Sequence, residues 1–135
     1  MIRSLCAFFA TVFVATAVMA APVVGKTAPD FSATDVISGK PVTLSELKGK
    51  TVVLEWNNFK CPFVKKFYSV GAMQKLQANA VKDGVVWISI NSSAKGKEGY
   101  LATAKVAKET LESNRSAASH YLLDADGTIG DRKSV

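Results

Sequence analysis

The sequence has few of the residues that build metal sites and disulfide frameworks, with two Cys and one His among 135 residues. Two cysteines cannot hold together a disulfide-dense mini-protein, and no Cys/His cluster surrounds His120, which excludes a structural zinc site. Nine Gly and four Pro are too few for a fibrous or low-complexity chain. A hydrophobic content of 48% with 21% charged residues predicts one globular domain.

The sequence also lacks a concentrated basic segment. Lys and Arg number 17 against 11 acidic residues, a net charge of +6, but the lysines are scattered along the chain. A nucleic-acid binder is expected to have a basic stripe interleaved with stacking aromatic residues, and no such stripe is found. We expect no nucleic-acid partner, and no sequence motif indicates a cofactor or a metal.

Residues 1–20 have the pattern of a secretory signal peptide. Arg3 provides the positive start, residues 5–18 form an apolar stretch, and Val18-Met19-Ala20 is a small-residue cleavage pattern, with the cut expected between Ala20 and Ala21. The apolar stretch is shorter than the roughly 20 residues that a membrane span needs. We therefore expect export across the inner membrane to the periplasm, with no stable membrane insertion after cleavage.

Cleavage would remove Cys6 and leave a domain of residues 21–135 with one cysteine, Cys61. A single cysteine in an oxidising compartment is either reactive or buried and inert. Cys61 is therefore the first candidate for chemistry.

The order of apolar segments predicts an α/β fold. Residues 51–56 are almost continuously apolar, as in a strand covered on both faces, and we expect this strand to be central in a sheet. Residues 62–81 have helical spacing and residues 85–90 form a second buried strand. A strand, a helix and a strand in this order predict a parallel crossover connection.

Within the helix 62–81, an apolar stripe is expected to pack and a polar set, which includes Gln77, to face water; the stripe consists of Phe63, Phe67, Met73, Leu76 and Ala80. Trp56 and Trp87 are expected mainly in the core. The remaining elements predicted are two short strands around a turn at Gly39 (28–31 and 38–41), a helical turn at 43–47 capped by Thr43 or Ser45, an amphipathic helix over 101–111, and a strand at 121–123.

Cys61 lies just after the first buried strand and directly before Pro62, a residue well suited to the first position of a helix. Unpaired amides at a helix N-terminus stabilise an anion, so this position favours the thiolate, which is the nucleophilic form of cysteine. Lys60, Lys65 and Lys66 add positive charge, and Trp56 and Pro62 are expected to shape the site. The alternative is an inert buried cysteine. His120 receives no role.

The sequence resembles the redoxins, the thioredoxin-fold group that contains AhpC/TSA-type peroxiredoxins and exported thiol-disulfide proteins. The resemblance covers residues 24 to about 130 and rests on four segments: 24–31 (VGKTAPDF), 39–50 (GKPVTLSELKGK), 54–56 (LEW) and 61–64 (CPFV). It implies a three-layer thioredoxin-like fold around a central β-sheet, with Cys61 as the attacking cysteine of a redox or antioxidant protein that acts in cell redox homeostasis.

The sequence departs from both patterns in this group. Val64 occupies the position of the second cysteine of a Cys-X-X-Cys motif, so the second thiol must come from elsewhere. Leu54 and Asn58 stand where peroxiredoxins have Pro and Thr or Ser, which argues against efficient peroxide activation. Redoxins also continue past a glycine like Gly130 into a helix, a cis-proline turn and two further strands. We therefore expect a C-terminally truncated redoxin in which the strand 51–56 has one exposed edge.

The leading hypothesis is an exported thiol oxidoreductase that uses Cys61 for thiol-disulfide exchange or peroxide reduction. Its partners would be an external thiol reductant and a disulfide-bearing protein, with peroxide as another substrate. The alternatives are a non-catalytic thioredoxin-fold binding protein, which holds a partner in its groove or at the exposed strand edge, and an inactive truncated redoxin. The sequence leaves the oligomeric state open.

Overall fold

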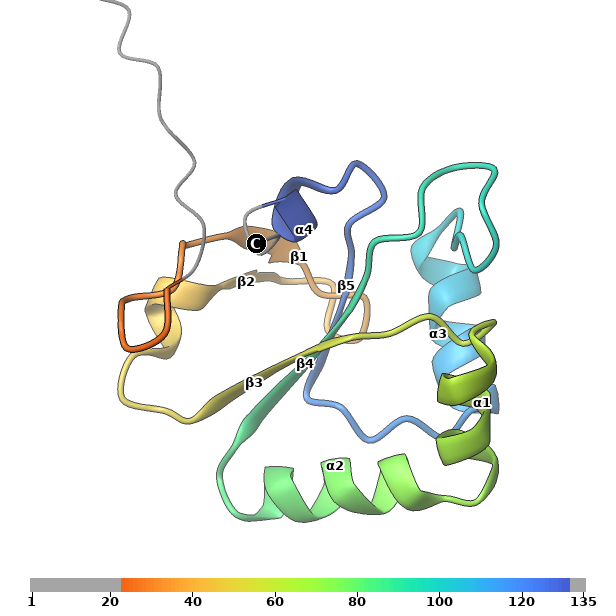
Figure 1. The fold of residues 1–135 in the computed structure, drawn as a ribbon, viewed down its shortest axis with the longest axis horizontal. Coiled ribbons are helices and arrows are strands. Elements are labelled where there is room, and N and C mark those ends of the chain that lie inside the picture. The colour runs from red at the N-terminus through yellow and green to blue at the C-terminus, as the bar shows by residue number, and fades with distance from the viewer. Residues whose placement is uncertain (1–22, 132–135) are drawn as a thin grey trace, which may run out of the picture.

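The computed structural model describes residues 23–131, so the predicted signal peptide lies outside the described residues. At its centre is a parallel sheet of β3 (Val52–Trp56), β4 (Val86–Asn91) and β5 (His120–Leu123), in the order β3-β4-β5 (Figure 1). The register pairs Val53 with Trp87 and Ile90 with Leu122. The predicted α/β class and the parallel connection between the two apolar strands are both confirmed.

One face of the sheet is covered by N- and C-terminal elements. These are the antiparallel hairpin of β1 (Ser32–Thr34) and β2 (Pro41–Thr43), the 3-10 helix η1 (Leu44–Leu47) and the short helix α4 (Thr128–Asp131) (Figure 1). The buried residues of this layer are apolar: Phe31, Val42, Ile88, Ile90, Leu122 and Ile129. Burial of such side chains supplies the main driving force for folding.

The opposite face is covered by helices α1 (Pro62–Ser69), α2 (Ala72–Lys82) and α3 (Ala104–Ser113). The second core cluster lies under them and consists of Val36, Phe59, Tyr68, Ala107, Leu111 and Tyr121. Three of its members are aromatic: Phe59, Tyr68 and Tyr121. Phe59 contacts Tyr68 edge-on, with 4.9 Å between ring centroids, and stacks on Tyr121 at 6.3 Å.

The single helix predicted over 62–81 is two helices. Gly71 adopts the left-handed conformation (φ 75°) and serves as the N-cap of α2, so the chain changes direction between α1 and α2. Left-handed backbone is accessible to glycine at little cost, and helical periodicity does not report such a break.

Three of the five residues predicted to form a buried apolar stripe are exposed instead. Phe63, Phe67 and Leu76 are 75%, 49% and 53% exposed, whereas Gln77 is fully buried. Gln77 is buried because Glu55 and Tyr68 accept its hydrogen bonds and Ala117 donates to it. Buried hydrogen-bonded polar residues are invisible to a pattern that sorts residues by hydropathy alone.

β4, and not β3, is the middle strand of the described sheet. The sequence prediction placed 51–56 there, but β3 is half-buried, and no strand within residues 23–131 pairs with its outer side. The outer side of β5 is covered, because Val36 N donates to Tyr121 O at 2.8 Å.

The smaller predicted elements are present with shifted bounds. The hairpin turns at Gly39 as predicted, but its two strands begin at Ser32 and Pro41, later than the predicted starts at residues 28 and 38. Thr43 is the N-cap of η1 without a side-chain capping bond; Asp30 Oδ1 instead accepts from Ser45 N at 2.9 Å. Helix α3 is capped by Thr103, whose Oγ1 accepts from Val106 N.

Over residues 23–131, no helix has the length and hydropathy of a membrane span.

Candidate active site

Cys61 lies in a turn that connects β3 to α1. Asn57 N donates to Ile90 O at 2.8 Å, which extends the β3–β4 pairing by one residue, and the buried ring of Phe59 then fixes the turn to the helical core. Cys61 is the N-cap of α1 with extended backbone (φ −60°, ψ 128°), and Pro62 follows at the first helical position. Cys61 O accepts the first helical hydrogen bond from Lys65 N at 2.9 Å. The predicted strand, cysteine and helix arrangement is therefore present.

The Cys61 thiol is a free, half-buried group. It lines an open cavity of about 270 Å³ at the carboxyl ends of β3 and β4, together with Trp56, Asn57, Asn58, Val64, Ile90, Ser92 and Ser93. In parallel sheets, this end of the strands is where ligands usually bind. Cys61 thus borders an open cavity.

Trp56 lines this cavity, so the predicted core position of its side chain is wrong. Its side chain is 42% exposed. The indole is held in one orientation because Nε1 donates to Ser92 Oγ at 3.2 Å, and Ser92 Oγ donates in turn to Asp124 Oδ2 at 2.6 Å. The indole N–H therefore has a hydrogen-bond partner, and the exposed part of the ring provides an apolar surface beside Cys61. Trp87 is buried as predicted.

The three lysines are not equivalent. All three are exposed: Lys60 precedes α1, Lys65 lies within it, and Lys66 is in its last turn. Lys60 and Lys65 line a separate cavity of about 380 Å³, between the Cys61 turn, the 99–101 segment and α3, whereas Lys66 lines neither this cavity nor that of Cys61. The structure gives none of them a contact with the sulfur atom, so their influence on it is long-range.

Sequence reasoning missed a polar network beside the turn. Glu55 Oε2 accepts hydrogen bonds from Gln77 Nε2 (3.0 Å), Trp87 Nε1 (2.8 Å) and Ser89 Oγ (2.7 Å), and Oε1 accepts from Asn57 Nδ2 (3.1 Å). Tyr68 Oη accepts from Gln77 Nε2 at 2.7 Å. Burial and the nearby Glu55 charge raise the pKa of Tyr68 to about 12. The signal in the sequence was an acidic residue inside the otherwise apolar run 51–56.

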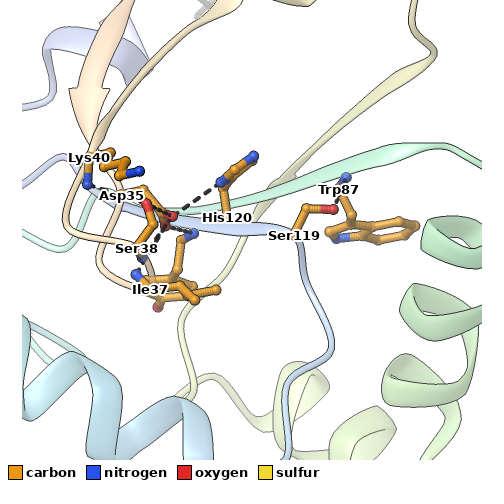
Figure 2. Close-up of polar contacts among 8 residues, drawn as sticks. Asp35, Ile37, Ser38, Lys40, Trp87, Ser119 and His120 are labelled. Carbon is orange, nitrogen blue, oxygen red and sulfur yellow. Dashed lines mark hydrogen bonds and ion pairs between the residues drawn. The ribbon is translucent and has the colours of Figure 1, made fainter.

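His120, which had no predicted role, pairs with Asp35 across the sheet edge (Figure 2). Its Nδ1 lies 3.1 Å from Asp35 Oδ2. Asp35 is 1% exposed and also accepts hydrogen bonds from Tyr121 N, Ile37 N, Ser38 N and Ser38 Oγ. Burial alone would raise the pKa of Asp35, but these hydrogen bonds outweigh it and the pKa is lowered. The pair attaches the hairpin turn to β5 and lies outside the cavity of Cys61.

No group of three His, Cys, Asp or Glu side chains that could hold a metal ion is found among residues 23–131. Within the same residues, Cys61 is the one cysteine, and Val64 occupies the position three residues later. The described site therefore offers a single free thiol beside an apolar surface.

Residues 24–132 match the model of the AhpC/TSA family. No curated protein matches the sequence. An uncharacterized conserved protein from Geobacillus kaustophilus is similar in structure, with 27% identity, a TM-score of 0.65, and coverage of 79% of this chain and 55% of the other. This chain thus spans about half the length of that protein.

Two solved structures with thiol-disulfide descriptions are also similar. The thioredoxin domain of a thiol-disulfide oxidoreductase from Bacteroides vulgatus has 20% identity and a TM-score of 0.56, with 83% of this chain and 71% of the other covered. A putative thiol:disulfide interchange protein from Chlorobium tepidum has 21% identity and a TM-score of 0.56, with 79% and 67% covered. At these identities the likeness establishes the thioredoxin-like fold.

Proposed function

Because the chain belongs to the AhpC/TSA family, we propose that it is a thiol-dependent oxidoreductase in which Cys61 is the nucleophile. The observation that carries the proposal is the position of Cys61 as the N-cap of α1, with a free thiol that lines an open cavity. The partial positive charge of a helix N-terminus favours the thiolate, and the thiolate is the form that attacks disulfides and peroxides. The exposed Lys60, Lys65 and Lys66 act in the same direction.

Thiol-disulfide exchange is the reaction we favour. The Cys61 thiolate attacks one sulfur of a substrate disulfide, a bond forms between the two sulfurs, and the other substrate sulfur leaves as a thiolate. Since Val64 supplies no second thiol, an external thiol then attacks the Cys61 sulfur of the mixed disulfide, and the second substrate sulfur leaves as a thiolate. A second external thiol attacks the external sulfur now bonded to Cys61 and releases Cys61 as a thiolate. The substrate disulfide is reduced to two thiols, and two external thiols are oxidised to one disulfide.

Asn58 supports this choice over peroxide reduction. It stands where peroxiredoxins have Thr or Ser, but its amide groups are engaged elsewhere: Oδ1 accepts from Lys60 N at 2.8 Å and Nδ2 donates to Glu98 O at 3.0 Å. Peroxide reduction would convert Cys61 to a sulfenic acid as the O–O bond breaks, and it would need a group to stabilise the leaving oxygen. The Asn58 side chain has no hydroxyl and its amide is held by these two bonds, so it is a poor substitute for Thr or Ser.

The proposed cellular setting follows from residues 1–20, which direct export and are then removed, so that residues 21–135 act in the periplasm as a single redoxin domain. A disulfide-bearing protein is the proposed substrate, and a thiol reductant is the second partner. Disulfide-bearing proteins form and persist in this oxidising compartment.

The test compares the wild-type protein with Cys61→Ser in two assays, reduction of a protein disulfide by an added thiol and consumption of a hydroperoxide by the same thiol. We expect Cys61-dependent disulfide reduction and little peroxide consumption. Unchanged disulfide reduction in Cys61→Ser contradicts the proposal, and Cys61-dependent peroxide consumption alone would replace exchange with peroxidase activity. A folded wild type with no turnover, whose Cys61→Ser variant still captures a protein partner, would indicate a non-catalytic binding protein.

A further inference from the structure

The backbone around Cys61 is attached to a loop that lies some forty residues further along the chain. Asn58 uses three of its polar groups here, two within the turn and one toward the loop. Its carbonyl O accepts from Cys61 N at 2.9 Å, its side-chain Oδ1 accepts from Lys60 N at 2.8 Å, and its Nδ2 donates to Glu98 O at 3.0 Å. The first two bonds shape the turn that presents Cys61, and the third fixes that turn to the 92–101 loop.

Gly99 provides the space that this connection needs. A Cβ atom at Gly99 would overlap Cγ, Oδ1 and Nδ2 of Asn58, so the amide group lies directly against the glycine Cα. Gly99 also has a left-handed backbone (φ 85°), and its carbonyl O accepts from Asn91 Nδ2 at 3.2 Å. Asn91 is buried at the end of β4, so the loop is itself attached to the central strand.

We propose that Asn58 is a positioning residue for Cys61, and that Gly99 holds Asn58 in place. The inference rests on the proposed function, since it assigns to the 92–101 loop control over the geometry of the same thiol. Cys61 N and Lys60 N are both fixed by Asn58, so displacement of Asn58 moves Cys61 relative to the first turn of α1. Small displacements of a reacting group have large effects on rate.

The experiment measures the rate at which Cys61 attacks a small aromatic disulfide, from about pH 5 to about pH 9, a range that spans the titration of cysteine thiols. We compare the wild type with Asn58→Ala, Gly99→Ala and Gly96→Ala. Gly96 is the matched control, because it lies in the same loop with nearly the same φ (80°) but a Cβ atom there would meet nothing within 4 Å. All three variants have their unfolding measured in urea.

We expect Asn58→Ala and Gly99→Ala to slow the attack by about tenfold at neutral pH and to move the midpoint of the pH profile. Gly96→Ala should keep the wild-type rate and profile. In the double variant Asn58→Ala/Gly99→Ala, the added Cβ atom has no amide to displace, so Gly99→Ala should have no further effect on the rate. Gly99→Ala retains every polar group of Asn58 and serves as the test if Asn58→Ala does not fold.

The inference is overturned if Asn58→Ala and Gly99→Ala lose stability but keep the wild-type rate and pH profile, because the contact would then be structural only. It is also overturned if Gly96→Ala slows the reaction as much as Gly99→Ala does. A wild-type Cys61 that reacts like an unstructured cysteine at every pH would contradict both the inference and the proposed function. A reactive wild type with unaffected variants would contradict the inference alone.

Discussion

The indole Nε1 of Trp87 donates a hydrogen bond to Glu55 Oε2 at 2.8 Å, and so links the middle strand of the sheet to a carboxylate on its edge strand. Ser89 Oγ and Gln77 Nε2 donate to the same oxygen. These bonds give partners to buried donors that would otherwise be left unpaired. This network joins β3, β4 and α2 just before the Cys61 turn.

We predict that Glu55→Gln lowers the free energy of unfolding by about 1–3 kcal/mol, because an amide nitrogen placed against these donors leaves buried groups unpaired. Urea unfolding at neutral pH measures the change. Glu46→Gln, at an exposed position of η1, is the matched control and should alter stability by less than about 0.5 kcal/mol. Equal stability of the two variants would show that the network contributes nothing.

Asp35→Asn is predicted to destabilise the protein by about 1–3 kcal/mol at neutral pH, since a carboxylate that accepts five hydrogen bonds is replaced by an amide. The lowered pKa of Asp35 means that its contribution is complete above its ordinary value of 3.8 and is lost as the pH falls through the lower folded value. The wild type should therefore have a higher urea midpoint than the variant at neutral pH, and this difference should shrink at acid pH. A difference that stays constant down to strongly acid pH would contradict this assignment.

Phe59 and Phe63 provide a test of which aromatic residues near Cys61 support the fold. Phe59 is buried against Tyr68 and Tyr121, so Phe59→Ala should cost about 3–5 kcal/mol. Phe63 is 75% exposed, and Phe63→Ala should change stability by less than about 0.5 kcal/mol. Thermal or urea unfolding of both variants distinguishes this arrangement from the apolar stripe that the sequence predicts, in which Phe63→Ala would be the costly change.

Gly71→Ala tests the break between α1 and α2. In a continuous helix, alanine would stabilise the protein by about 1 kcal/mol relative to glycine. In the observed structure, Gly71 has a φ of 75°, so alanine should instead destabilise by about 1–2 kcal/mol. A Cβ atom at Gly71 meets no other atom within 4 Å, which leaves backbone strain as the cause. Ala78→Gly, at an exposed position in α2, calibrates the helical preference in the same assay.

The positive charges around α1 are predicted to favour the attack by Cys61 modestly, because they are exposed and screened by salt. The combined replacement of Lys60, Lys65 and Lys66 by Gln should slow the reaction with a small anionic disulfide by about threefold at low ionic strength. The difference should shrink as salt is added. Lys75→Gln, exposed on α2, is the control and should leave the rate unchanged. If the rate does not depend on these charges, the three lysines have no part in the reaction of Cys61.

The sequence by itself determined the α/β class, the parallel pair of apolar strands and the position of Cys61 before a helix that begins at Pro62. These features are local: a hydrophobic run, a helical spacing and a proline each fix the backbone over a few residues. They were enough to place Cys61 in the fold.

Only the tertiary structure decided which strand is central, which helix face is buried and what surrounds the thiol. The burial of Gln77 and the exposure of Phe63 depend on partners distant in sequence, such as Glu55, and hydropathy does not encode such partners. The contact of Asn58 with Gly99 likewise joins two turns that are unremarkable on their own. Hydrogen bonds between side chains of different strands and loops form only in the assembled fold, and these bonds determine the surroundings of Cys61.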